Sequence, residues 1–432
     1  MAVEGSSAHS TVRGKLSPVI IPTAGPDYTA VGPTRPSVAQ TDNEQVLWGK
    51  KREHMNLGVT MEQPDSPTNR HRSGMRSPYL EWAKTRSQAR YTLASSGMAS
   101  YTLADFLSRG WVGQEDLELT GPGGYGYEPL QQALAAKNGV APTCVVAAAG
   151  TSMANHLAMA ATFEPGDEIL IEQPTYELLL STALYLGARV RRFARRFEAG
   201  FRLDPREVRG ALTPRTRLIV ITNLHNPSSA LTDEDTLREV GELAKGVGAR
   251  VLVDEVYLEA CYSTARRSAF HLGNHFVATS SLTKAYGLGG LRCGWVLAEP
   301  GLVRAMWRLN DFYGVNAAHP AERLGVVALN HLDEIAASYA NLLTRNRQAV
   351  NRFLDTRPDL EVARHPFGTV LFPRLREGEA EAFCELLRSR YETSVVPGKF
   401  FEAPQHFRMF VGAQEPILAE GLERLKRALD EY

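Results

Sequence analysis

The feature that most constrains the fold is an alternation of two kinds of segment from about residue 76 onward. Short runs rich in Val, Ile and Leu alternate with segments whose apolar residues have helical spacing, such as Ser152–Phe163 and Asp233–Lys245. Strands that are apolar along their whole length need a cover on both faces, which a mostly parallel sheet between helices provides. The sequence therefore predicts an α/β domain with strands at Cys144–Ala149, Glu168–Glu172, Arg189–Phe193, Arg217–Thr222, Arg250–Asp254, Phe276–Thr279 and Cys293–Val296.

The pattern changes beyond about residue 320. A long helix is expected over roughly Ala321–Asp355, and a closing helix over Pro416–Tyr432. Between them, shorter strands are expected near Leu360–Arg364, Val370–Pro373 and Phe407–Val411. This order of elements predicts a second, smaller α+β domain.

Residues 1–75 differ from the rest of the chain in composition. They are rich in Pro, Ser, Thr and Gly and have little hydrophobic periodicity. Such a segment buries too little apolar surface to offset the entropy lost on ordering, so we expect a flexible extension. The first residues lack the basic and apolar regions of a secretory signal. An alternative is an over-long start, because Met75 stands just before the first patterned segment.

The charge balance and the cysteines exclude several classes of protein. The 48 Lys and Arg residues balance 48 Asp and Glu residues, so the chain lacks the basic footprint of a nucleic-acid binder. The four cysteines are far apart, which fits a reducing cytoplasm and argues against a zinc cluster or a disulfide scaffold. The apolar runs are far shorter than the roughly 18 residues of a membrane span. We therefore expect a cytoplasmic protein that binds neither nucleic acid nor membrane.

Polar residues follow the predicted strands at their carboxyl ends, where open α/β sheets bind ligands. They are Gly150-Thr151-Ser152, Asn226, Asp254 and Ser281-Leu-Thr-Lys284. Pyridoxal 5′-phosphate (PLP) requires such a set. A lysine condenses with its aldehyde, a carboxylate faces its pyridine nitrogen, and donors hold its phenolate oxygen. Its phosphate needs a helix N-terminus with hydroxyls and an arginine.

Several longer motifs occur in the order found in a known family. They are Pro165-Gly-Asp-Glu-Ile-Leu-Ile-Glu-Gln-Pro-Thr-Tyr176, Asn226-Pro227, Asp254-Glu-Val-Tyr257, Ser281-Leu-Thr-Lys284 and Gly290-Leu-Arg292-Cys-Gly294. Across about residues 78–432 the chain resembles the class I/II aminotransferases, which are fold type I PLP-dependent enzymes of the aspartate aminotransferase superfamily. The resemblance implies a large PLP-binding domain at 113–319. It also implies a smaller α+β domain formed by both chain ends, 76–112 and 320–432.

The resemblance implies roles for individual residues. Lys284 would form the Schiff base with PLP and then move the proton between the substrate Cα and C4′ of the cofactor. Asp254 would keep the pyridine nitrogen protonated. Tyr257 and Asn226 would donate to the phenolate oxygen, and Tyr176 would lie over the ring. The expected catalytic residues are Lys284, Asp254 and Tyr257.

The resemblance also implies residues for the charged ends of the two ligands. The cofactor phosphate would be bound by Gly150, Thr151, Ser152, Ser281 and Arg292. The substrate would be bound by Gly97, Asn226 and Arg408. The Arg408 guanidinium would hold the α-carboxylate as a bidentate fork, a task that lysine performs poorly. No metal site is expected.

The chain departs from the family pattern at three places. Asn226-Pro-Ser-Ser229 replaces the usual Asn-Pro-Thr-Gly, and Thr283 precedes the lysine. Gly121 stands where a tyrosine usually reaches the phosphate of the partner subunit, and Tyr125 is the neighbouring residue that could take over this contact. Because the family shares its active site across a dimer interface, the resemblance implies a homodimer.

A basic run and one histidine also stand out in the sequence. The basic run from Arg189 to Arg196 is interpreted as a solvated edge of the large domain. His225 stands next to Asn226 and is either close to the cofactor or purely structural. The histidines form no spaced set of metal ligands.

Three classes of function are candidates for this chain. Transamination, the ping-pong exchange of an amino group between an amino acid and a 2-oxo acid, is the predicted activity. The alternative is a PLP-dependent lyase or an enzyme like aminocyclopropane-carboxylate synthase, because residues of the pocket decide which bond breaks. A non-enzymatic regulator on this fold would carry a winged-helix head, which residues 1–75 do not resemble. The sequence does not identify the substrate side chain.

Overall fold

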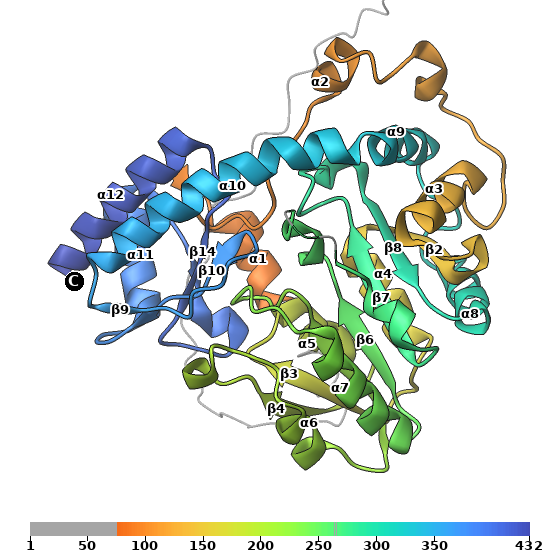
Figure 1. The fold of residues 1–432 in the computed structure, drawn as a ribbon, viewed down its shortest axis with the longest axis horizontal. Helices are drawn as coiled ribbons and strands as arrows, with labels where there is room; N and C mark the ends of the chain where they lie inside the picture. Colours follow the sequence, from red (N-terminus) through yellow and green to blue (C-terminus); the bar gives the residue numbers. More distant parts are fainter. Residues whose placement is uncertain (1–75, 263, 265) are drawn as a thin grey trace, which may run out of the picture. The chain divides into compact units, whose positions relative to one another are not determined.

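The computed structural model describes residues 76–432 except 263 and 265 (Figure 1). The predicted flexible extension, residues 1–75, lies outside this range. The centre is a seven-stranded sheet of β2 (Val145–Ala149), β3 (Glu168–Gln173), β4 (Arg189–Ala194), β5 (Thr216–Thr222), β6 (Arg250–Asp254), β7 (Phe276–Ser281) and β8 (Cys293–Leu297). Its strand order is β2-β8-β7-β6-β5-β3-β4. Only the two pairings of β8, with β2 and with β7, are antiparallel in this sheet.

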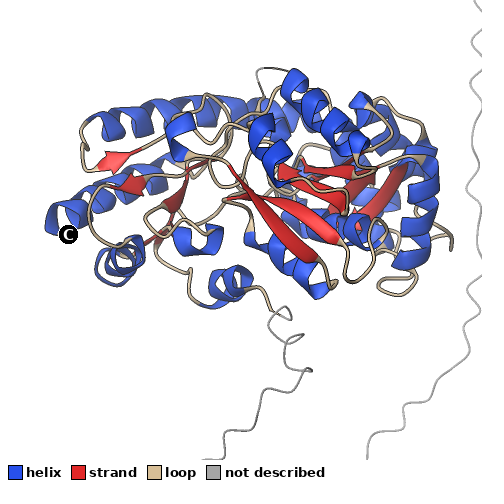
Figure 2. Ribbon diagram, turned by 90° about the horizontal axis from the view of Figure 1, so that it is seen from below, coloured by secondary structure: helices blue, strands red, loops and turns tan. Residues whose placement is uncertain are grey.

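Helices cover both faces of this sheet (Figure 2). One face carries α4 (Gly150–Ala160), α5 (Glu177–Tyr185) and α8 (Pro300–Asn310), and the other carries α6 (Pro205–Ala211) and α7 (Glu234–Gly246). In β5, Leu218 and Val220 pack on the first face while Ile219 and Ile221 pack on the second. Successive residues of a strand point to opposite faces, so an uninterrupted apolar strand fills both layers. The predicted α/β fold with a mostly parallel sheet is confirmed.

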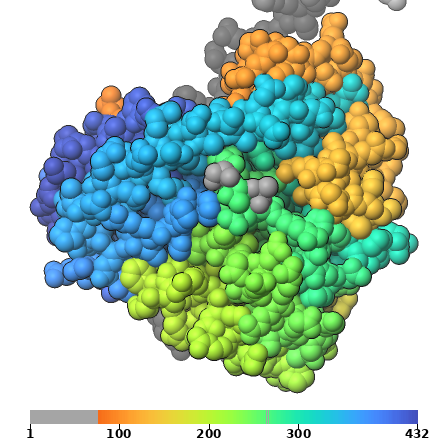
Figure 3. All heavy atoms as spheres, in the orientation of Figure 1, coloured from red at the N-terminus to blue at the C-terminus, as the bar shows by residue number. Residues whose placement is uncertain are grey.

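The C-terminal part of the chain packs beside this sheet. It contains α10 (Leu332–Asp355), α11 (Ala380–Tyr391), α12 (Glu415–Glu431) and the short strands β9 (Leu360–Glu361), β10 (Val370–Leu371), β11 (Arg374–Leu375), β12 (Thr393–Ser394), β13 (Val396–Pro397) and β14 (Phe407–Phe410). In the space-filling view, blue C-terminal residues lie beside the yellow-green segment (Figure 3). One contact between the sheet and the C-terminal part is the hydrogen bond that Arg192 donates to Glu402 at 2.6 Å. The two parts therefore form one continuous surface.

The N-terminal described segment joins the C-terminal part. Strand β1 (Tyr91–Thr92) pairs in parallel with β12, and α1 (Pro78–Thr85) packs against α5. After α2 (Leu103–Ser108), α3 (Glu128–Asn138) leads into the sheet. This pairing is consistent with the prediction that both ends of the chain form the smaller domain. The boundaries at 112 and 320 stay a prediction.

The single long helix expected over Ala321–Asp355 is wrong. Two helices occupy this segment, α9 (His319–Asn330) and α10, and they are separated by His331. The backbone of His331 has φ −120° and ψ 17°, outside the helical region. Its ring stacks on Trp111 with a centroid distance of 4.2 Å. Helical spacing continues across this residue, so the sequence pattern did not reveal the break.

The described residues contain neither a membrane-spanning helix nor a cluster of metal ligands. No helix in this part of the chain is both long enough and apolar enough to cross a bilayer. No three or more His, Cys, Asp or Glu side chains among the residues with described positions are grouped so that they could hold a metal.

Candidate active site

A cavity of about 190 Å³ lies at the carboxyl ends of the parallel strands, beside the C-terminal part. Its lining includes most of the predicted site residues, namely Thr151, Ser152, Tyr176, Asn226, Asp254, Tyr257, Ser281, Lys284, Arg292 and Arg408. Parallel strands end at the same edge of a sheet, so residues that follow different strands meet there. The structure thus brings together in one hollow side chains that are spread over the whole sequence.

The two predicted glycines lie next to this cavity without lining it. Gly150 begins α4 with φ +79°, and a Cβ at this position would collide with the Arg292 guanidinium. Gly97 packs against the chain at the lysine, because a Cβ there would lie 3.0 Å from the Thr283 carbonyl oxygen and 3.4 Å from Lys284 Cδ. Both positions are close-approach glycines. Gly97 therefore contacts Lys284, and its predicted contact with a substrate carboxylate stays a prediction.

Lys284 follows β7 and points into the cavity. Its Nζ donates to Ser96 Oγ at 2.9 Å. Burial lowers the pKa of Lys284 to about 8, the positive charges of Arg408 and Arg292 act in the same direction, and Asp254 opposes them. About a tenth of this amine is therefore neutral, and so nucleophilic, at about pH 7, far more than for a solvated lysine.

Asp254 is the last residue of β6 and is buried. Asn155 Nδ2 donates to its Oδ2 at 2.8 Å, and the Val256 backbone N–H donates to its Oδ1 at 3.1 Å. Thr279 in turn donates to Asn155 Oδ1 at 2.6 Å, which fixes the orientation of that amide. Burial raises the pKa of Asp254 to about 6 despite these donors. A cation placed against this carboxylate would stabilise its charged form and so lower its pKa again, and a protonated pyridine nitrogen is such a cation.

The opposite end of the cavity is rich in donors. Thr151, in the first turn of α4, donates its hydroxyl to Ser281 Oγ at 2.8 Å. The Arg292 guanidinium lies over the same helix start, donating to the carbonyls of Ala149 at 3.0 Å and Gly289 at 3.2 Å. A helix N-terminus, hydroxyls and an arginine together favour a phosphate dianion. This donor set fits the phosphate of PLP.

Arg408 of β14 closes the side of the cavity formed by the C-terminal part. It is buried, and it donates to Asn226 Oδ1 at 3.0 Å and to the Tyr79 hydroxyl at 2.8 Å. It also lies over the rings of Tyr79 and Phe401, with centroid distances of 5.5 and 5.0 Å. Its Nε is buried and has no hydrogen-bond partner among the described residues. A buried guanidinium with a donor to spare is suited to a carboxylate ligand.

Two tyrosines form further walls of the cavity. Tyr176 follows the turn after β3, and its ring meets that of Tyr79 edge to face at 5.7 Å. Tyr257 is a buried residue three positions after Asp254, and burial raises its pKa to about 12. A tyrosine with a raised pKa keeps its proton at neutral pH, so Tyr257 can donate a hydrogen bond.

Sequence reasoning missed several residues of the cavity, among them Asn155, Ser96 and Tyr79. Asn155 lies four residues after Thr151 on α4, and this helical spacing could have revealed it. Ser96 is adjacent to the predicted Gly97, so proximity in the chain was the available signal. Tyr79 reaches the cavity from α1, and no local motif marks it.

The basic run from Arg189 to Arg196 was interpreted wrongly in part. Strand β4 is indeed at the edge of the sheet, and Arg189 and Arg191 are exposed. Arg195, however, is fully buried and forms a 2.8 Å ion pair with Glu172. Residue 195 lies just beyond β4, and its guanidinium finds further acceptors in the Thr222 carbonyl and the Thr232 hydroxyl.

The fold and this cavity define a PLP-dependent enzyme of fold type I. The chain belongs to the class I and II aminotransferase family, whose model matches residues 115–425. A capreomycidine synthase of Streptomyces vinaceus is 30% identical over 366 residues, covering 82% of this chain and 93% of the synthase. A probable aspartate/prephenate aminotransferase of Aquifex aeolicus is 26% identical over 302 residues, covering 67% of this chain and 77% of that protein.

A solved structure gives the same result. The crystal structure of a PLP-dependent aminotransferase from Streptococcus suis superimposes with a TM-score of 0.78 at 27% identity. The match covers 83% of this chain and 98% of that chain. The similarity thus extends over both the sheet and the C-terminal part.

Proposed function

We propose that this chain is an aminotransferase that exchanges an amino group between an amino acid and a 2-oxo acid by a ping-pong mechanism. The observation that carries the proposal is that Lys284 lines one cavity with the buried Asp254 carboxylate and the buried Arg408 guanidinium, whose charges both act on its amine. A proton-moving amine needs a neutral form, and the lowered pKa of Lys284 supplies it. Membership of the aminotransferase family supports the same reaction.

The residues around the cavity would hold PLP by its three polar groups. Thr151, Ser152, Ser281 and Arg292 would bind the phosphate, with Gly150 allowing Arg292 to approach the helix start. Asp254 would bind the ring nitrogen. When bound, PLP supplies an electron sink for the charge left on the substrate α-carbon.

The remaining residues would hold the ring and act on the substrate. Tyr257 and Asn226 would donate to the phenolate oxygen of PLP, and Tyr176 would cover the ring face. Arg408 would bind the substrate α-carboxylate, for which its Nε–H is unpartnered among the described residues, with Gly97 packing beside the carboxylate. Lys284 would take the proton from the α-carbon and return it to another atom.

A second candidate is a PLP-dependent lyase or synthase. The observation that favours it is the similarity to a capreomycidine synthase across most of both chains. The Lys284 proton transfer is common to both candidates, and the two differ in the bond that changes afterwards. In transamination the amino group stays on the enzyme, whereas in elimination or ring closure a side-chain bond breaks.

A half-reaction screen separates the two candidates. The PLP-loaded protein is mixed with a panel of amino acids without any acceptor, and conversion of the cofactor to its amine form is followed by absorbance. Transamination predicts stoichiometric conversion, which 2-oxoglutarate or another 2-oxo acid reverses. Repeated turnover without an acceptor, with release of ammonia or of a cyclised product, would refute transamination and support the second candidate. Lys284→Ala serves as the inactive control.

We also propose that the enzyme is a homodimer. Six of the exposed large apolar side chains of the described residues lie in two segments, at Leu117, Leu119, Tyr125, Phe312, Tyr313 and Val315. The Tyr125 hydroxyl donates to Asp311 at 3.3 Å, so the two segments lie side by side. Phe312 is 84% exposed, which is unusual for an aromatic side chain on a monomer surface.

Light scattering during gel filtration tests this proposal. The expected mass is twice that of the chain, and Phe312→Glu is expected to give a monomer with little activity. An active monomer, in the parent protein or in the variant, would contradict a site shared between subunits.

A further inference from the structure

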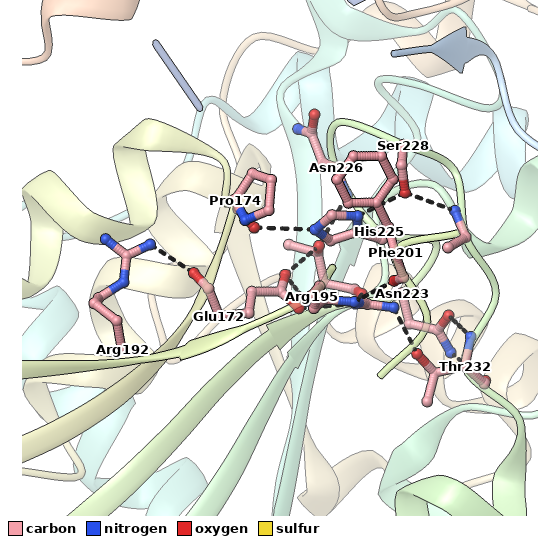
Figure 4. Close-up of polar contacts among 12 residues, drawn as sticks. Glu172, Pro174, Arg192, Arg195, Phe201, Asn223, His225, Asn226, Ser228 and Thr232 are labelled. Carbon is pink, nitrogen blue, oxygen red and sulfur yellow. Dashed lines mark hydrogen bonds and ion pairs between the residues drawn. The ribbon is translucent and has the colours of Figure 1, made fainter. Parts of the chain in front are cut away.

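A buried ion pair lies near Asn226, a residue that lines the cavity (Figure 4). Arg195 Nη1 donates to Glu172 Oε2 at 2.8 Å, and both side chains have 0% exposure. Arg195 also donates to the Phe201 carbonyl at 2.7 Å and to Thr232 Oγ1 at 3.2 Å. A charge pair in this environment is costly unless its remaining donors and acceptors are satisfied. The mechanism proposed above does not use this pair.

One branch of the network leads from Glu172 to Asn226. Thr222 donates to Glu172 Oε1 through its backbone N–H at 2.7 Å and through its hydroxyl at 2.6 Å. The same hydroxyl accepts the backbone N–H of Asn226 at 2.9 Å. Thr222 therefore connects the carboxylate to the backbone of a residue that lines the cavity. Because Arg408 occupies Asn226 Oδ1, the amide NH₂ of Asn226 is the end that can donate into the cavity.

A second branch leads from Arg195 through Phe201, whose carbonyl accepts from Arg195 Nε at 2.7 Å and whose ring centroid lies 5.8 Å from that of His225. His225 in turn contacts the turn that carries Tyr176. His225 Nε2 lies 3.0 Å from the Pro174 carbonyl oxygen, which can only accept, so this nitrogen carries the proton. His225 Nδ1 then accepts from Ser228 Oγ at 2.7 Å. Burial keeps the pKa of His225 well below its usual value, and the Arg195 charge acts in the same direction. The neutral ring thus ties the Asn226 segment to the Tyr176 turn.

We propose that Glu172 and Arg195, acting through Thr222 and His225, are positioning residues that fix Asn226 and Tyr176 against the cofactor. The proposal rests on the PLP site described above but not on the choice between transamination and elimination. The ion pair is linked to two segments, the one that carries Asn226 and the turn that carries Tyr176. Both segments would contact the cofactor, each from a different side. Its loss is therefore expected to change the state of the bound cofactor as well as the stability of the fold.

The link through Thr222 offers a test with a matched control. Thr222→Val removes the hydroxyl with little change of shape, and Thr222→Ser restores it. Thr216→Val is the control, because Thr216 is also buried on β5 and its hydroxyl donates to Glu168 on β3 at 2.8 Å, at the end of the sheet away from the cavity. Each protein is loaded with PLP, and its visible absorption is titrated against pH without substrate.

The expected result follows from the charge on the phenolate oxygen. A hydrogen bond from Asn226 favours the anionic form of this oxygen, so a misplaced Asn226 leaves the bound cofactor protonated to a higher pH. For Thr222→Val we expect the titration midpoint to rise by roughly half a pH unit to one unit. Thr222→Ser should return the midpoint to its parent value. Thr216→Val should lower the melting temperature without moving the midpoint.

Two outcomes would overturn the proposal. One is an unchanged midpoint in folded Thr222→Val, and the other is an equal shift in Thr216→Val. If Thr222→Val does not fold, His225→Phe tests the other branch, with His275→Phe at the far end of β7 as its control. His225→Phe is expected to weaken PLP binding to the cofactor-free protein about tenfold, as measured by fluorescence titration. Unchanged affinity would refute the role of His225.

Discussion

The two ends of the β3–β5 pairing use the same kinds of residue for different purposes. At the amino end, Thr216 and Thr213 donate their hydroxyls to Glu168 at 2.8 and 2.6 Å. At the carboxyl end, Thr222 donates to Glu172 at 2.6 Å. In each case a glutamate of β3 is satisfied by threonine hydroxyls from the neighbouring strand or the turn before it. The two ends differ in the cation that accompanies the carboxylate.

The amino end has arginines that remain in solvent. Arg191 and Arg215 lie 3.9 Å from Glu168 and are 45% and 76% exposed. Burial raises the pKa of Glu168, but the hydroxyls and these arginines outweigh it, so the net pKa is lowered. At the carboxyl end burial is complete, and the Arg195 guanidinium offsets only part of the rise in the pKa of Glu172. The costly buried pair, Glu172 with Arg195, thus occurs at the end of the sheet where segments around the cavity are positioned. The exposed pairs of Glu168, which cost less desolvation, occur at the other end.

The largest expected effect on activity comes from removing the lysine at the carboxyl edge of the sheet. Lys284→Ala is expected to lose about 10⁴-fold in kcat, because it removes the group that moves the proton. It should also no longer retain PLP covalently after borohydride treatment, as measured by mass spectrometry. Lys245→Ala, at an exposed position on α7, is the control and should keep both properties. Covalent retention of PLP by Lys284→Ala would show that another residue holds the cofactor.

The next largest effect concerns the two glutamates. Glu172→Gln is expected to destabilise the protein by about 3–5 kcal/mol, because it leaves the buried Arg195 without a counter-charge. Glu168→Gln is expected to cost about 1 kcal/mol, because the hydroxyls can still donate and the arginines can turn to solvent. Urea unfolding of both variants and the parent measures the difference. Equal losses would mean that burial of the pair has no energetic consequence.

The contrast also explains how much the sequence could predict. Asp254 and Lys284 were predictable because each directly follows an apolar strand within a recognisable motif, and the ends of parallel strands meet at one edge. The burial of Arg195 was not predictable. The run Arg-Val-Arg-Arg-Phe-Ala-Arg-Arg is typical of a solvated edge, and the acceptors that bury its seventh residue come from Phe201, Thr222 and Thr232.

The contribution of Tyr79 shows the same limit. This residue precedes Arg408 by 329 positions, yet its hydroxyl accepts a 2.8 Å hydrogen bond from that guanidinium. Local spacing carries no information about such a contact, because it forms only when the two chain ends pack together. The parts of the cavity that arise from the order of strands were therefore accessible to sequence reasoning. Those that arise from packing of distant segments were not.

A smaller effect is expected for Asp254 at the carboxyl end of β6. Asp254→Asn keeps the shape of the side chain but removes the charge that would hold the ring nitrogen protonated. We expect kcat to fall about 10²–10³-fold, while the phosphate contacts retain PLP with a modest loss of affinity. Asp167→Asn, in the turn before β3, tests whether any carboxylate near the sheet has this effect. Near-parent kcat for Asp254→Asn would refute its assigned role.

The smallest effect is a pH dependence at the same end of the sheet. Burial and the two arginines lower the pKa of Lys284 from 10.5 to about 8, so folding favours its neutral form. The rate at which cofactor-free protein takes up PLP covalently should therefore rise about tenfold between about pH 7 and about pH 9 and then level off. A solvated lysine would show a rate that continues to rise beyond about pH 10.

The sign of the effect on stability follows from the same shift. Because the unfolded chain binds the Lys284 proton more tightly than the folded chain, this lysine destabilises the cofactor-free protein at low pH, and the penalty disappears as the pH rises from about 8 to above 10.5. Stopped-flow absorbance gives the uptake rate, and Arg408→Gln sharpens the comparison. Removing the buried guanidinium should raise the pKa of Lys284 and move the rate midpoint to higher pH. A midpoint that stays in place would show that burial alone sets the pKa of this amine.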